Sequence, residues 1–125
     1  MVIKKIKISI KSLEDSFREA RKVASEIDRG IFKRRMPEIN FESFEIYKKT
    51  FTPKRIELLQ IIKSRNPKTI KELSLMAQRD FKNVYTDLKL LKMYDLVQLK
   101  KTTQGLMPRI AYDEIILDMR IPLAV

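Results

Sequence analysis

Apolar and polar residues alternate near the N-terminus. Ile6, Ile8 and Ile10 occupy every second position, with Lys or Ser between them. Because successive side chains of a strand point to opposite faces, this pattern predicts a half-buried strand over residues 5–11. Its outward lysines are typical of an edge strand, where they hinder aggregation; contact with nucleic acid is the alternative interpretation.

The hydrophobic period then changes to that of an amphipathic helix. Ser12 is a suitable N-cap, and the helix is predicted to end near Arg29 and Gly30. The apolar stripe, at spacings of four and three, consists of Leu13, Phe17, Ala20, Ala24 and Ile27. Such a stripe indicates packing against the rest of the domain or against a second subunit. Membrane binding is disfavoured, because the opposite face mixes acidic and basic residues.

Residues 30–42 are predicted to connect this helix to the rest of the chain. Pro37 prevents a helix through this segment, because proline lacks an amide hydrogen. The alternation from Glu38 to Glu42 predicts either a brief strand or an extended docking segment.

Helical signals become dense from Ser43 onward. Phe44, Tyr47 and Phe51 form a one-sided apolar face, and Thr52 followed by Pro53 is a strong helix start. The helix from Pro53 to about Ser64 is apolar around much of its circumference, so we expect it to be central and buried.

Two shorter signals follow. Thr69 and Glu72 have the spacing of a capping box and predict a helix over 70–77, with Ser74 facing outward. After a tight joint at Gln78 and Arg79, Asp80 is the predicted cap of a longer helix. Its predicted core stripe consists of Phe81, Val84, Leu88 and Leu91.

The C-terminal part reverts to strand patterns. Residues 97–101 alternate, 102–105 form a turn with a glycine, and 106–112 extend again, which predicts a hairpin. A last strand is predicted from Ile115, with Leu117, Met119 and Ile121 on the same face.

Composition narrows the function classes. The 125 residues carry a net charge of +11, which favours a polyanionic partner such as nucleic acid. There is no Cys and no His, and no nucleophile or metal-ligand motif appears, so we expect no enzyme, cofactor or metal. No apolar run is long enough to span a bilayer, and we expect a cytoplasmic protein without membrane contact.

Four segments together resemble winged-helix transcriptional regulators of the broad MarR/ArsR kind. They are residues 51–59, Thr-Ile-Lys-Glu-Leu at 69–73, Arg-Asp-Phe-Lys-Asn-Val-Tyr within 79–88, and Tyr-Asp-Leu-Val at 94–97. The chain is especially similar to a family of small DNA-binding proteins of archaea and bacteria, often encoded beside toxin genes and described as antitoxins. The resemblance implies an α+β fold, with a winged helix-turn-helix domain over 43–112. An N-terminal strand and helix extension (1–42) for dimerisation or partner binding and a C-terminal strand (113–125) would flank it.

In such a domain, the helix after Asp80 would enter the major groove of DNA. Asn83 would pair with adenine, Arg79 or Lys82 with guanine, and Tyr85 or Thr86 with a base edge, a thymine methyl or a phosphate. The remaining predicted contacts are to phosphates, from Lys68, Lys71, Ser74 and Lys89 on the helices and from Lys100, Lys101 and Arg109 near the wing. Asp95 replaces the usual glycine before the wing, and the wing tip has no arginine.

We therefore expect a repressor that binds double-stranded DNA as a homodimer and acts as the antitoxin of a toxin protein. Two alternatives stay open. In the first, the protein is an interaction module that neutralises a toxin with little specific DNA binding. In the second, the winged helix binds RNA, which shares the charge signature.

Overall fold

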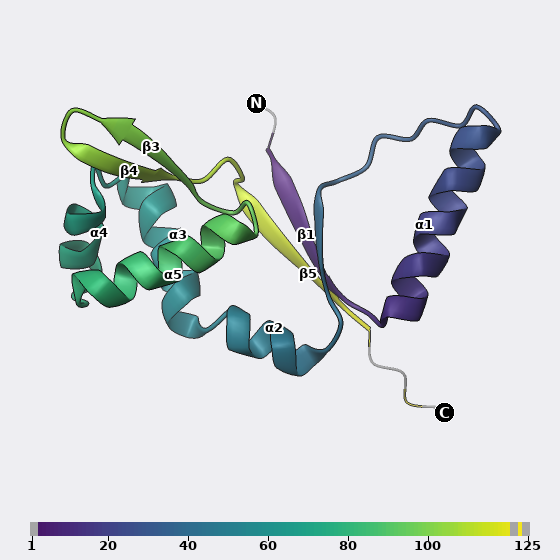
Figure 1. The fold of residues 1–125 in the computed structure, drawn as a ribbon, viewed down its shortest axis with the longest axis horizontal. Helices are drawn as coiled ribbons and strands as arrows, with labels where there is room; N and C mark the ends of the chain where they lie inside the picture. Colours follow the sequence, from purple (N-terminus) through teal and green to yellow (C-terminus); the bar gives the residue numbers. More distant parts are fainter. Residues whose placement is uncertain (1–2, 121–122, 124–125) are drawn as a thin grey trace. The chain divides into compact units, whose positions relative to one another are not determined.

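A computed structural model describes residues 3–120 and residue 123. Within this part, the chain forms five helices and five strands, which confirms the predicted α+β class (Figure 1). Contacts divide the chain into two units. The helical unit consists of Phe51–Asp113 with the N-terminal segment up to Lys4, and the sheet unit consists of Lys5–Thr50 with the C-terminal segment from Glu114.

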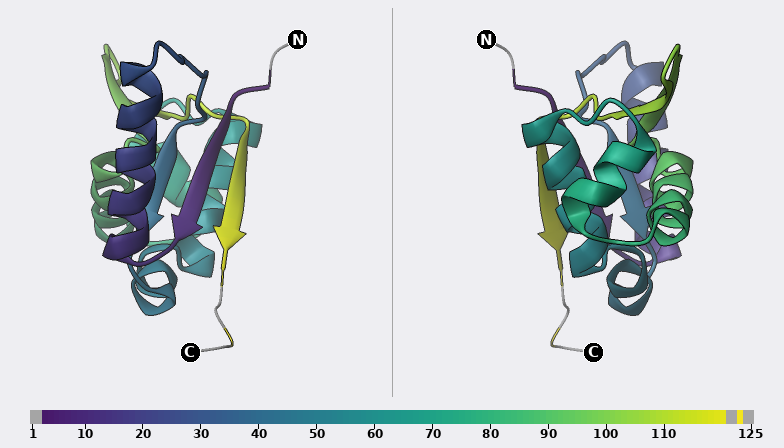
Figure 2. Two further views of the ribbon diagram at one scale, coloured as in Figure 1. Left: turned by 90° about the vertical axis from the view of Figure 1, so that its right-hand side faces the viewer. Right: turned by 90° about the vertical axis from the view of Figure 1, so that its left-hand side faces the viewer.

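The sheet unit is built on three parallel strands. They are β1 (Lys5–Ile10), β2 (Glu38–Phe41) and β5 (Glu114–Met119), in the order β2-β1-β5. Figure 2 shows the three arrows running in the same direction. The prediction that the first strand lies at an edge is wrong, because the connector and the C-terminal segment each add a strand beside it.

The register of these strands separates an apolar face from a polar one. Ile8 is paired with Ile39 on one side and with Leu117 on the other, and Ile6, Ile8, Ile10 and Phe41 are buried on this face. Ile115 and Met119 share it, as predicted, whereas Ile121 lies outside the described residues. The opposite face carries Lys7, Ser9, Glu38, Asn40 and Asp118.

Helix α1 (Leu13–Asp28) connects β1 to β2 and has the predicted start. The Ser12 hydroxyl accepts a hydrogen bond from the Asp15 amide at 3.2 Å. Gly30 (φ +77°) follows the helix end, and its amide donates to the Ile27 carbonyl at 2.9 Å. The apolar stripe does not pack on its own domain, however, since Phe17 is 59% exposed. The short helix α2 (Phe44–Thr50) also belongs to the sheet unit, so the division lies after it and not at the predicted residue 42.

The helical unit contains three helices followed by an antiparallel hairpin. The helices are α3 (Pro53–Arg65), α4 (Ile70–Ala77) and α5 (Phe81–Met93), and the hairpin consists of β3 (Gln98–Thr102) and β4 (Gly105–Arg109). Each lies where the sequence predicts it. The core is formed by fully buried side chains, among them Leu58, Ile62, Leu73, Val84, Leu88, Leu91 and Leu96.

Side-chain capping explains where two of these three helices begin. Thr52 and Thr69 accept hydrogen bonds from the amides of Arg55 and Glu72, as an N-cap should. Two predictions at the start of α5 are wrong. The Asp80 side chain makes no capping hydrogen bond, and Phe81 is 48% exposed instead of lying in the core.

Candidate nucleic-acid interface

The joint between α4 and α5 orients α5. Gln78 adopts a left-handed conformation (φ 54°), and the Arg79 amide donates to the Ser74 carbonyl at 3.0 Å. Val84, Leu88 and Leu91 then anchor α5 in the core. The outer face consists of exposed Lys82, Asn83, Thr86 and Lys89, as predicted.

Aromatic residues extend this outer face. The rings of Phe81 and Tyr85 are stacked, with centroids 6.1 Å apart and planes at 12°. The Lys89 ammonium lies 5.2 Å from the centroid of the Tyr85 ring. Phe81 was predicted to lie in the core, although its spacing of four to Tyr85 and eight to Lys89 places all three on one helix face.

Arg79 does not extend outward as predicted. Its Nη2 lies 2.7 Å from Oδ2 of Asp87, while Nε of Arg55 lies 3.0 Å from Oδ1 of the same carboxylate. All three side chains are at most 20% exposed, and Nη1 of Arg79 is buried without a hydrogen-bond partner. Because Asp87 holds the guanidinium inside the unit, Arg79 connects the joint to α5, and it does not lie on the exposed outer face where the sequence placed it.

Ser74 was predicted to face outward, but its side chain is buried. It is 5% exposed, and its hydroxyl donates to the Lys71 carbonyl at 2.7 Å. The reason is that Ser74 lies four residues after the buried Ile70, so both side chains are on the inner side of α4. Lys71 and Lys68 are exposed, so the predicted phosphate contacts of α4 reduce to these two lysines.

The hairpin offers fewer cations than predicted. Nη1 of Arg109 donates to the carbonyls of Pro67 at 2.8 Å and Pro108 at 2.7 Å, which ties β4 to the loop before α4. Lys100 and Lys101 are both exposed, but as neighbours in a strand they point to opposite faces. Arg109 is therefore engaged within the fold, and the two lysines present their charges on opposite faces of the hairpin, while the phosphate contacts of all three stay a prediction.

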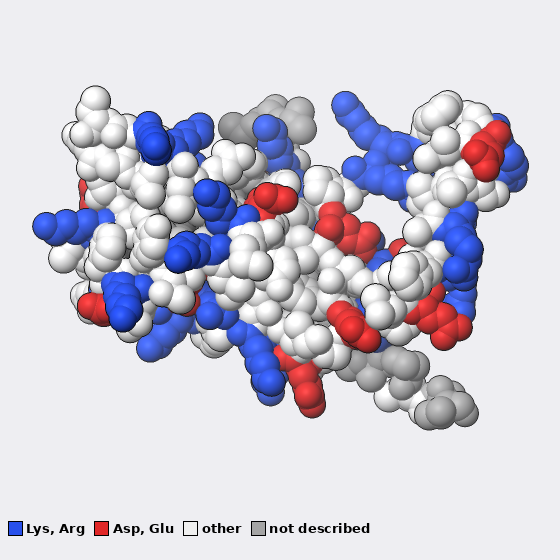
Figure 3. Space-filling view, viewed as in Figure 1, with Lys and Arg blue, Asp and Glu red and all other residues white. Residues whose placement is uncertain are grey.

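Basic side chains outnumber acidic ones in the helical unit as a whole. Residues 52–109 contain 13 Lys and Arg against 5 Asp and Glu. In the view of Figure 3, basic atoms are spread over the helices and hairpin of the helical unit, and few acidic atoms interrupt them. A positive surface of this kind is suited to a phosphate backbone.

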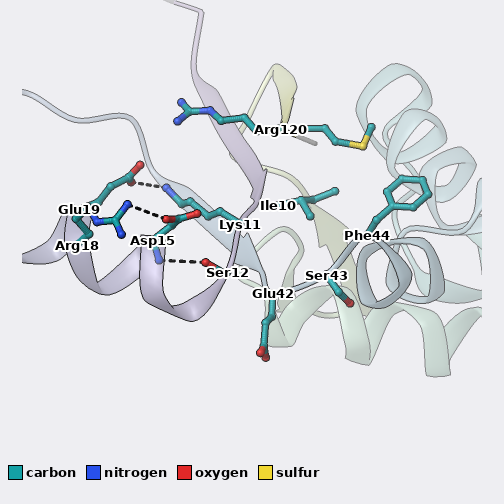
Figure 4. A pocket seen from close by; sticks show the side chains of 11 residues that line it. Ile10, Lys11, Ser12, Asp15, Arg18, Glu19, Glu42, Ser43, Phe44 and Arg120 are labelled. Carbon is teal, nitrogen blue, oxygen red and sulfur yellow. Dashed lines mark hydrogen bonds and ion pairs between the residues drawn. The ribbon is translucent and has the colours of Figure 1, made fainter. Parts of the chain in front are cut away.

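A cavity in the sheet unit lies at the carboxyl ends of its strands (Figure 4). Its basic lining residues are Lys11, Arg18 and Arg120. Each is ion-paired: Lys11 with Glu19 and with Glu38 at 3.0 Å, Arg18 with Asp15 at 3.1 Å, and Arg120 with Asp118 at 3.2 Å. Their charges are already compensated, so the cavity does not offer a free cation to an anionic ligand.

The ion pairs shift the titration of two of these groups. Burial opposes the charged form of Lys11, but hydrogen bonds to Glu19 and Glu38 outweigh it and raise the pKa of Lys11. Burial likewise opposes ionisation of Glu38, but hydrogen bonds from Ser9 and Lys11 lower the pKa of Glu38 below its ordinary value. In their ionised forms, Lys11 and Glu38 therefore stabilise the folded sheet unit.

Among the described residues, no three Asp, Glu, His or Cys side chains come together where they could hold a metal ion. None of the helices within residues 3–120 is long and apolar enough to cross a lipid bilayer.

The comparisons with known proteins give one match. No curated protein and no solved structure matches the chain significantly. The model of the HVO_A0114 family matches residues 50–117, which include the whole of α3, α4, α5 and the hairpin. Because this match covers more than half of the 125 residues, the chain belongs to the HVO_A0114 family.

Proposed function

We propose that the helical unit is a winged helix-turn-helix domain that binds double-stranded DNA sequence-specifically and represses transcription. One observation carries the proposal: α5 follows a tight joint, is anchored by a buried stripe, and presents Lys82, Asn83, Thr86 and Lys89 outward. A helix with such a face fits the major groove, where its first two turns reach base edges.

The side chains on α5 divide by chemistry. The amide of Asn83 can donate to and accept from the edge of adenine, and Lys82 can donate to the acceptors of guanine. Phe81 and Tyr85 offer apolar surface to a thymine methyl group. Lys89 on α5 and Lys68 and Lys71 near the start of α4 are suited to phosphates, which set the position of the protein on the duplex.

Arg79, Ser74 and Arg109 have positioning roles in this proposal. Arg79 holds the start of α5 through Asp87, Ser74 bonds within α4, and Arg109 ties the hairpin to the loop before α4. The orientation of α5 relative to the hairpin then depends on groups that do not touch DNA.

RNA binding is the second candidate function. It is favoured by the stacked pair of Phe81 and Tyr85, since exposed aromatic rings can stack on unpaired bases. A competition experiment separates the two candidates: fluorescently labelled duplex DNA is displaced by unlabelled duplex or by single-stranded RNA of the same sequence. The proposal predicts that the duplex is the stronger competitor, and stronger competition by the RNA would contradict it.

The antitoxin role and a toxin partner follow from the family resemblance described above. In this proposal, the sheet unit is available to a partner protein while the helical unit binds the operator. Co-expression with the product of a neighbouring gene, followed by co-purification and a growth assay, tests this role. Failure to neutralise the neighbour's toxicity would remove the antitoxin role and leave the DNA-binding proposal intact.

A further inference from the structure

Helix α1 turns its apolar stripe away from its own unit. Its contacts with the sheet are polar: the Asn40 side-chain amide donates to the Ser16 hydroxyl, and Lys11 pairs with Glu19. At the other end of the helix, the buried Glu26 carboxylate lies 2.9 Å from Nη2 of Arg35. The inner side of α1 is therefore mainly hydrophilic, and of the apolar stripe only Ala20 borders the hollow between α1 and the sheet.

The stripe itself is exposed along the whole helix. Leu13 is 52% exposed, Phe17 59% and Ile27 49%, and the following Ile31 and Phe32 are 37% and 80% exposed. Leu13, Phe17 and Ile27 lie on one face of α1, and exposed apolar side chains grouped in this way are unusual for a monomer, because apolar area left in water lowers stability. Spacings of four and three along the stripe are those of a helix that packs against another helix.

The size order along the stripe indicates the partner. Within α1, the stripe from Phe17 to Ile27 reads large, small, small, large, and this order is the same in both directions, with Ala20 and Ala24 at the centre. A two-fold symmetric contact requires that residue i of one copy meets residue j of the other and the reverse. An antiparallel pair of such helices satisfies this rule and brings the backbones close at the two alanines.

Charge favours the same arrangement. The first turn of α1 carries Glu14 and Asp15, both paired with Arg18, whereas the other end is followed by Arg29 and a basic triplet, of which Lys33 and Arg35 pair with Glu26. The difference in charge between the two ends therefore rests mainly on Arg29 and Arg34. An antiparallel pair places the acidic end of each copy beside the basic end of the other. A parallel pair would place like charges together.

We propose that α1 is the interface of a homodimer, in which the stripes of two copies pack antiparallel with Ala20 of one opposite Ala24 of the other. The inference is independent of the DNA-binding proposal, since it is tested without nucleic acid. It predicts a particle of twice the 14.9 kDa chain mass in sedimentation velocity, with a monomer–dimer equilibrium that depends on concentration.

Substitution of Ala20 by Glu places a charge in the centre of the interface. Because an unpaired buried charge is costly, we expect the dimer dissociation constant to rise by more than about tenfold. Ser25→Glu adds the same charge on the exposed far side of α1 and should leave the constant unchanged. Circular dichroism of both variants should match the original chain, since Glu has nearly the helix propensity of Ala.

Cysteine cross-linking tests the orientation, because the chain has no native cysteine. An oxidised mixture of Ala20→Cys and Ala24→Cys proteins should form a disulfide faster than either variant alone. Three results would overturn the proposal: a monomer at every concentration, a dimer that tolerates Ala20→Glu, or faster cross-linking within each single variant, which would indicate parallel helices.

Discussion

The Asp87 carboxylate pairs with two arginines, and the residues next to it in the sequence give no sign of either pairing. It lies on the inner side of α5 and receives Arg79 from the joint and Arg55 from α3, so that one carboxylate fixes three segments. The polar outer face of α5 is thus supported from behind by an ion pair cluster. Arg79 was predicted to contact DNA because the spacing of polar residues placed it at the start of the outer face of α5. That spacing does not reveal the ion pair with Asp87, eight residues further along the chain.

Removal of this carboxylate should destabilise the helical unit. Asp87→Ala leaves two partly buried guanidinium groups without their counter-charge, and we expect a loss of about 3 kcal/mol in the free energy of unfolding. Chemical denaturation monitored by circular dichroism measures this loss. Glu57→Ala, which removes an exposed carboxylate from α3, is the matched control. A loss below about 1 kcal/mol for Asp87→Ala would mean that the cluster is not structural.

The residues proposed to read bases are Lys82 and Asn83, both of which are exposed. The double substitution Lys82→Ala and Asn83→Ala should weaken binding to the operator by at least about tenfold while leaving the thermal midpoint nearly unchanged. Fluorescence anisotropy and a thermal melt provide the two readouts. Lys54→Ala removes an exposed lysine from α3 and should affect binding less. If the thermal midpoint collapses, the two residues are structural and the assignment of α5 fails.

Elements with local signals were predictable from the sequence, and long-range pairings were not. The hydroxyls of Thr52 and Thr69 accept hydrogen bonds from amides three residues later, as N-cap residues do. The starts of α3 and α4 could therefore be predicted from the sequence. The partners of β1 come from segments about 30 and 110 residues away, and no local pattern announces them. Phe81 follows the helical period of a buried stripe but sits at the first residue of α5, where the core does not cover it.

The polar face of the sheet unit predicts a dependence on pH. Because the pKa of Glu38 is lower in the folded chain than its ordinary value, ionised Glu38 stabilises the fold at neutral pH. This contribution is lost as the pH falls through the folded pKa. Thermal melts of Glu38→Gln should therefore show a smaller loss of stability between about pH 5 and about pH 2 than the original chain shows.

Glu42→Gln provides the control for this experiment, since Glu42 is an exposed carboxylate that directly follows β2. Its acid dependence should follow that of the original chain. Equal acid dependence in Glu38→Gln and the original chain would show that the contacts of Glu38 with Ser9 and Lys11 do not contribute to stability.

At the scale of the whole molecule, the net charge of +11 and the family match concern the same segment. Residues 52–109 hold most of the charge excess, and the family model covers them. Charge alone predicts a polyanionic partner but not its kind, because RNA and DNA share the phosphate backbone. Whether the proposed partner is DNA or RNA depends on the geometry of α5, and the amino-acid composition gives no information about that geometry.

The central claim is sequence-specific binding of duplex DNA by the outer face of α5. It is tested most directly by titrating the purified protein against a duplex from the region upstream of its own gene and against a scrambled duplex, each at two salt concentrations. We predict binding to the upstream duplex that is tighter by roughly a thousandfold, with an affinity that falls as salt rises. Equal affinity for the two duplexes, or no binding to either at low salt, would contradict the account.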